Sequence, residues 1–194
     1  MNWLDKLVKH YRSKEGVADI FGIILYTDAH ANVKKVVSDD DYWDSFHEIS
    51  GENWVVFSIR PVEGHYETPQ FRPGTVGLMC EIWKEPNENK PLLREFEIED
   101  TSKLPQLLVF THDSEGNILK SSLKLQDSSI AEAYRSIKES IQVVTNAVDA
   151  IHVENKKNPE GAYQAVSMAI DSKHAWEIIK KGVDFFAWLN QFKP

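Results

Sequence analysis

Two residues with chemically versatile side chains, Asp28 and His30, follow an uncharged run from Gly22 to Tyr26. Such a run is typical of a strand buried on both faces, and ligands of α/β sheets bind at the ends of strands. A carboxylate and an imidazole at this place provide either a metal-binding pair or an acid–base pair. The alternative is turn chemistry, because an Asp side chain often accepts hydrogen bonds from backbone N–H groups in a turn. We favour the turn.

Further polar side chains lie close to a long loop. The segment from Pro61 to Pro73 contains Gly64 as well as prolines, and a loop of this length inside a domain is often functional. Arg60 precedes it, and His65 lies within it. Together with the pair after the first strand, these residues would make an enzyme site, with metal-assisted hydrolysis as one possible reaction. Equally, they are ordinary loop residues, and the enzyme is the alternative function.

Three carboxylates alternate with apolar residues from Leu93 to Asp100. The alternation predicts a strand with Glu95, Glu97 and Glu99 on one face. Such a row either protects the edge of a sheet from unwanted pairing or provides a docking surface for a basic partner. Edge protection is the simpler interpretation.

The single cysteine, Cys80, excludes an internal disulfide and fits a reducing compartment. The segment Thr75–Trp83 around it fits either a helix face or an alternating strand. Gly77 and the β-branched residues favour a strand, which would form a hairpin with Leu92–Ile98. Cys80 lies on the apolar side in both cases, which indicates a buried and unreactive thiol.

The most ordered pattern of the chain runs from Lys103 to Leu125. Two β-type runs flank a short turn that contains Gly116, and this arrangement predicts a hairpin. Pro105 stands at the start of the first run, where a missing N–H group costs little. The sequence Ser129-Ile-Ala-Glu132 then forms a capping box that opens a long amphipathic helix from Ile130 to Ile151.

This order of elements resembles the C-terminal half of thioredoxin-fold proteins, and Leu104-Pro105-Gln106 carries the resemblance. The resemblance implies a cis peptide bond before Pro105, beside the redox site of the family. It covers roughly Phe21 to Ala150 and implies an α/β fold in which a thioredoxin-like mixed sheet is flanked by helices. The family's redox members carry Cys-x-x-Cys after the second strand, whereas Arg60-Pro61-Val62-Glu63 stands there in this chain. The resemblance therefore implies a redox-inactive member.

The first half of the chain shows further helix and strand signals. Ser38 is the predicted N-cap of a helix over Asp39–Ile49, and Gly51 is predicted to end that helix. The largely apolar run from Asn53 to Pro61 predicts an interior strand that stops at the proline. At the N-terminus, Trp3, Leu4, Leu7 and Tyr11 share one face of a short helix that we expect to pack on the domain.

The C-terminal segment is rich in aromatic residues. Asn158 and Pro159 are expected to open a last helix that reaches Lys193, as an extension (151–194) packed on the thioredoxin-like domain (1–150). Ile170, Ile178, Val183 and Phe186 are predicted to face the domain. Trp176 and Trp188 belong to a second apolar face that we expect to bind a partner or a second copy of the chain.

Composition narrows the function. The chain has 194 residues and a net charge of −8, which disfavours nucleic acid and suits a basic protein partner. No apolar run approaches the length of a membrane span, and the sequence predicts a cytoplasmic protein. No motif for a cofactor, a metal or a catalytic nucleophile occurs. We therefore expect a non-catalytic thioredoxin-like binding module, such as an adaptor, a chaperone-like protein or an inhibitor or immunity-type protein. The residues expected to bind are Arg60, Pro105, Glu95, Glu97, Glu99, Trp176 and Trp188.

Overall fold

The structure is a computed structural model, and it describes residues 3–14, 17–58, 65–67, 82–84, 90–152 and 155–190. The side chains of residues 3–7, 65–67, 82–84, 90–92 and 178–190 are outside this description. The helices are α1 (Trp3–Arg12), α2 (Ala31–Ser38), α3 (Asp40–Ser50), α4 (Lys90–Glu95), the 3-10 turn η2 (Thr101–Lys103), α5 (Ile130–Asp149) and α6 (Pro159–Asn190). The strands are β1 (Phe21–Leu25), β2 (Val55–Ser58), β3 (His65–Glu67), β4 (Ile82–Lys84), β5 (Gln106–His112) and β6 (Ile118–Lys124).

A four-stranded mixed sheet with the order β2-β1-β5-β6 forms the centre of the fold. β1 pairs in parallel with β2 and antiparallel with β5, and β5 pairs antiparallel with β6. All five residues of β1 are buried, as the uncharged run from Gly22 predicts. β3 and β4 form a separate two-stranded antiparallel sheet. The expected α/β class and mixed sheet are thus confirmed.

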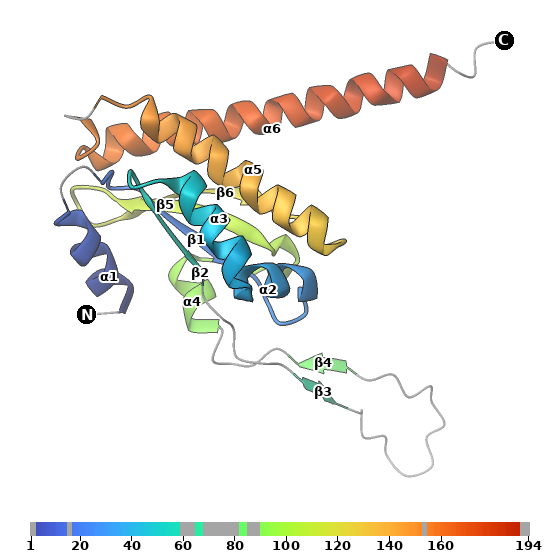
Figure 1. Ribbon diagram of the computed structural model, residues 1–194, viewed down its shortest axis with the longest axis horizontal. Coiled ribbons are helices and arrows are strands. Elements are labelled where there is room, and N and C mark those ends of the chain that lie inside the picture. The colour runs from blue at the N-terminus through green and yellow to red at the C-terminus, as the bar shows by residue number, and fades with distance from the viewer. Residues whose placement is uncertain are drawn as a thin grey trace.

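Helices cover both faces of the four-stranded sheet (Figure 1). On one face, α2, α3, α5 and the first half of α6 enclose a core around Ile24, Phe46 and Ile137. On the other face, α1 and α4 enclose a core around Phe21, Phe96 and Phe110. Each large apolar side chain buried in these layers contributes about 1.5–3 kcal/mol.

The hairpin and the helix after it match the sequence prediction. The Leu104–Pro105 peptide bond is cis, as expected. Gly116 lies in the turn with a φ of 89°, a conformation that glycine adopts without steric cost. Ser129 accepts a hydrogen bond from the backbone N–H of Glu132 at 3.2 Å and begins α5.

Helix α3 has a different cap from the predicted one. Asp39, and not Ser38, is the N-cap, and its Oδ1 accepts hydrogen bonds from the N–H groups of Asp41 and Tyr42. Ser38 is the last residue of α2, a helix that the sequence did not reveal. The chain is extended at Asp39, which separates the two helices. Gly51 ends α3 with a φ of 62°, as predicted.

One strand prediction is wrong, and with it the hairpin that was expected to include it; residues 75–81 of the other expected strand lie outside the described residues. Leu93–Asp100 is not a strand, because Leu93 belongs to α4, and it packs together with Phe96 into the core. Glu97 adopts a φ of 52°, and the N–H groups of Glu97 and Ile98 bond back to α4. The segment therefore follows the helical spacing of Leu93 and Phe96, which are three residues apart, and does not follow the strand-like alternation. Consequently, β4 pairs with β3, and the expected hairpin between Thr75–Trp83 and Leu92–Ile98 does not form.

Strand β2 is also placed differently from the prediction. The run from Asn53 to Pro61 predicts an interior strand, but within the described sheet β2 is outermost and its four residues are half-buried. Trp54 fixes the start of this strand. Its indole is buried and donates a hydrogen bond to the Thr145 hydroxyl at 2.9 Å. A Cβ atom on Gly22 of the neighbouring strand would lie 2.6 Å from Trp54 Cζ3, so the indole occupies the space that glycine leaves.

Ion pairs hold α1 against the sheet. Arg12 Nε lies 3.4 Å from Asp19 Oδ2, and Lys157 Nζ lies 3.5 Å from the other carboxylate oxygen of Asp19. Arg12 also donates a hydrogen bond to the His112 carbonyl at 2.7 Å. These contacts fix the end of α1, and with it Tyr11, beside β2.

Candidate functional site

The cis proline lies next to the segment that follows β1. Leu25 pairs with Gln106 in the sheet, so the antiparallel register brings Tyr26 to the level of Pro105. Pro105 is buried. The sequence interpretation placed the family's redox position at Arg60–Glu63, which lies outside the described residues. Within the described residues, Tyr26 continues β1 at this level, and on the other side the Leu125 N–H donates a 2.9 Å hydrogen bond to the Pro105 carbonyl.

The polar groups of the segment that follows β1 bond to one another. Asp28 forms an ion pair with Lys34. His30 Nδ1 accepts a hydrogen bond from the Thr27 N–H at 3.1 Å and lies 2.8 Å from the Thr27 hydroxyl. Asp28 and His30 therefore stabilise the turn before α2, in agreement with the favoured interpretation.

The loop between β6 and α5 completes the same network. Asp127 Oδ1 accepts a hydrogen bond from the Val33 N–H at 2.7 Å, and the Asp127 carbonyl accepts one from the Asn32 side chain at 2.6 Å. Asp127 thus satisfies a free N–H group at the start of α2 from a distant part of the chain. In the part of the chain that is described, no three His, Cys, Asp or Glu residues form a group that could hold a metal ion.

The three predicted carboxylates do not form a row. Glu95 ends α4, and Glu97 and Glu99 line a hollow of about 430 Å³ together with Asp100 and Lys120. Lys120 donates a 2.6 Å hydrogen bond to Glu97, and this bond and the lysine charge lower the pKa of Glu97. Hydrogen bonds from Ser102 lower the pKa of Asp100. Glu97 is paired with Lys120 and Asp100 caps η2, and because Leu93–Asp100 is not a strand, the expectation of a continuous acidic strand face is wrong.

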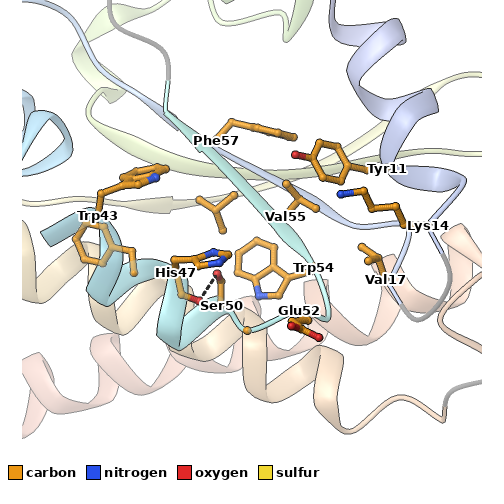
Figure 2. Close-up of a pocket in the computed structure, with 13 residues that line it drawn as sticks. Tyr11, Lys14, Val17, Trp43, His47, Ser50, Glu52, Trp54, Val55 and Phe57 are labelled. Atoms are coloured by element: carbon orange, nitrogen blue, oxygen red, sulfur yellow. Dashed lines mark hydrogen bonds between the residues drawn. The ribbon is translucent and has the colours of Figure 1, made fainter. Parts of the chain in front are cut away.

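A larger hollow of about 520 Å³ lies beside β2 (Figure 2). We call it the β2 groove. The residues that line it come from α1 and the chain after it, from α3, and from β2: Tyr11, Lys14, Val17, Trp43, Phe46, His47, Ser50, Gly51, Glu52, Trp54, Val55, Val56 and Phe57. Five of these side chains are aromatic rings of Phe, Trp or Tyr. The buried Trp54 and Phe46 form its base.

The two sides of the β2 groove differ in chemistry. Figure 2 shows Trp43 and His47 of α3 on one side of the strand, and Tyr11 and Lys14 on the other. Val56 packs in the core layer of α3. Phe57 packs in the layer of α1, where its ring centroid lies 5.8 Å from that of Tyr11. The groove therefore passes around the outer edge of the sheet and touches both faces.

The charges of the two sides also differ. The exposed side chains of α3 are those of Asp40, Asp41, Asp44, His47 and Glu48, so four of the five are acidic. On the opposite side, Lys14 Nζ lies 4.6 Å from the centroid of the Tyr11 ring. At this distance the ammonium group interacts with the aromatic face. The Tyr11 ring on the α1 side is therefore already in contact with a cation.

The C-terminal helix contributes a second exposed aromatic group. Ala162, Val166 and Ile170 of α6 are buried against α5 and the sheet. Further along, Trp176 is 67% exposed, and α6 projects beyond the sheet (Figure 1). The side chains of Trp188, Ile178, Val183 and Phe186 lie outside the described residues, and so do Arg60 and Cys80.

The sequence therefore predicted the turn after β1, the cis bond before Pro105 and the exposed position of Trp176, but not the β2 groove. Trp43 is half-buried, packs against the core and also lines the groove, whereas β2 was predicted as an interior strand. The only local feature of the sequence here is that Val55-Val56-Phe57-Ser58 carries no charge, which an interior strand shares.

Comparison with protein-family models, with curated proteins and with solved structures gave no match to this chain. None of the helices within the described residues has the length and the apolar character needed to cross a membrane. The site must therefore be interpreted from its own geometry.

Proposed function

We propose that this chain is a non-catalytic, thioredoxin-like protein-binding module of the cytoplasm that works without a cofactor. The thioredoxin-like part of the proposal is supported by the cis bond before Pro105, the mixed sheet and the hairpin followed by α5. The absence of a Cys-x-x-Cys motif from the sequence supports a redox-inactive member.

The β2 groove carries the binding part of the proposal. Its combination of half-buried aromatic rings with an uncharged outer strand is typical of a surface that another protein covers, because aromatic residues dominate binding energy at interfaces. Asp28 and His30, the residues that an enzyme would have used, are engaged in the turn before α2. The acidic flank of α3 suits a basic partner.

The experiment is quantitative capture of partners from an extract of the native host by the full-length chain. Trp43→Ala and Val56→Lys change the β2 groove, and Trp176→Ala is the matched aromatic control on α6. The expected result is a partner that both groove variants lose, by about tenfold or more in retained amount. Far-UV circular dichroism and thermal unfolding establish that the variants are folded.

Each outcome has a defined meaning. A partner lost only with Trp176→Ala would move the binding surface to α6, the second surface that its exposed indole favours. A partner retained by all three folded variants would contradict binding at the β2 groove. Stoichiometric metal in the purified protein, together with hydrolytic activity, would contradict the non-catalytic assignment.

A further inference from the structure

The outer side of β2 bears backbone N–H and C=O groups with which no other strand of the described residues pairs. Within the described residues, β2 pairs only with β1. The outermost strand of a sheet presents a row of N–H and C=O groups, and proteins usually protect such a row with lysine, proline or a bulge. Residues 55–58 contain no charge and no proline.

A strand added to this side would alternate its side chains between the two sides of the groove. Side chains that point toward α3 would meet Trp43 and His47, which line the groove. The carboxylates of Asp40 and Asp44 continue the helix face of His47, seven and three residues before it. Side chains that point the other way would meet the rings of Tyr11 and Phe57. The first environment suits Lys or Arg, since a cation gains from both the carboxylates and the indole face. The second suits an apolar or aromatic residue, because Lys14 already occupies the Tyr11 ring.

We propose that the outer edge of β2 binds an extended basic segment of a partner protein as an additional strand, with Lys or Arg at alternate positions over α3 and apolar residues between them over Tyr11 and Phe57. This inference rests on the proposed function and specifies how the β2 groove recognises its partner. Main-chain hydrogen bonds provide affinity in this mode, and alternate side chains provide specificity.

Charge complementarity decides in favour of a basic segment. The α3 side carries four exposed carboxylates and no lysine or arginine, and the whole chain has a net charge of −8. An acidic segment would be repelled at each position that faces α3. An extended segment is favoured over a helix because the strand itself forms the centre of the groove, with one aromatic side on each face.

The experiment is selection of random peptides of about ten residues, displayed on phage, against the immobilised full-length chain. The expected enriched sequences alternate Lys or Arg with apolar residues. A synthetic peptide of the enriched sequence is then titrated against the double variant Asp40→Lys/Asp44→Lys. Its affinity should fall at least about tenfold.

The control is the double variant Glu139→Lys/Asp171→Lys. It changes the net charge by the same amount at exposed positions of α5 and α6. These two helices contribute no residue to the lining of the groove, whereas α3 contributes four. The control should bind the peptide within about threefold of the natural chain, because distant exposed charges are screened by salt.

Pairing of the peptide with β2 as an additional strand is tested separately, on the natural chain. In amide hydrogen exchange followed by NMR, the N–H groups of residues 55–58 that face outward should become protected when the peptide binds. N-methylation of the peptide at alternate backbone positions should weaken binding by roughly three- to tenfold for each hydrogen bond removed.

Enrichment of acidic or helical peptides, or no enrichment, would overturn this inference. Binding without protection of the β2 amide groups would also overturn it. Either result leaves the proposed function standing if the captured partner still depends on Trp43 and Val56. A captured partner whose binding is unaffected by changes at both residues would contradict the proposed function itself.

Discussion

The described sheet has two outer strands, β2 and β6, and they differ in their charged residues. Both are half-buried over most of their length. β6 carries Lys120 and Lys124, whose ammonium groups bond to the carbonyl groups of Phe96, Ser102 and Leu104. β2 carries no charged residue and instead borders the aromatic β2 groove.

The difference teaches that exposure alone does not identify a binding edge. A strand that proteins must keep from pairing receives lysine, because burying an ammonium group against another chain is costly. A strand that pairs with a partner cannot carry that protection. The uncharged edge with aromatic flanks is therefore the one that we assign to binding, and the comparison can be tested on both sides.

The largest expected effect is the loss of stability when Trp54, a buried residue at the base of the β2 groove, is replaced. Trp54→Ala removes a buried indole and its hydrogen bond to Thr145, and should lower the free energy of unfolding by about 3–5 kcal/mol. Trp43→Ala, at the half-buried rim, should cost only about 1 kcal/mol. Urea unfolding of both variants measures this contrast. Equal losses would show that Trp43 belongs to the core as much as Trp54 does, and would weaken its assignment to a binding surface.

A smaller effect is expected when the protection of β6 is removed. Lys124→Val loses two hydrogen bonds to backbone carbonyl groups and should cost about 1 kcal/mol. Combined with Lys120→Val, it leaves β6 as uncharged as β2, so the chain should associate at high protein concentration. Static light scattering measures the association, and Lys35→Val, on the exposed side of α2, is the matched control. If the double variant stays as monodisperse as the control, lysine does not protect this edge.

The smallest expected effect is the pH dependence of the β6 edge. Lys120 lowers the pKa of Glu97 below its ordinary value of 4.5. Because the folded state holds the carboxylate more strongly than the unfolded state does, the pair stabilises the fold above the unfolded pKa. This contribution disappears as the pH falls through the lower folded pKa. The difference in unfolding free energy between the natural chain and Glu97→Gln should therefore be largest at neutral pH and vanish in acid. A difference that persists in strong acid would assign the effect to packing.

Sequence patterns predicted the elements whose local signals agree with their tertiary surroundings. The run from Gly22 to Tyr26, the hairpin around Gly116 and the helix after Ser129 are consistent at both levels. The structure of Leu93–Asp100 was not predicted, because its alternation fits a strand. In the structure, Leu93 and Phe96 pack in one cluster with the distant Phe110, and this packing favours a helical turn.

The β2 groove could not be predicted for a related reason. Tyr11, Trp43 and Phe57 come from three separate elements, and no local pattern reports that they meet. An uncharged strand looks the same in a sequence whether neighbouring strands or a binding partner cover it. Only the strand order of the sheet distinguishes the two cases.

The close approach of Gly22 and Trp54 also has an evolutionary consequence. Any side chain at position 22 would meet the indole, since a Cβ atom there lies 2.6 Å from Cζ3 and 3.2 Å from Cη2. Chains that descend from a common ancestor with this one should therefore change the two positions together, with a larger residue at 22 only where the residue at 54 is smaller. Covariation between positions 22 and 54 would therefore identify relatives that keep the base of the β2 groove, even where the residues of its rim differ.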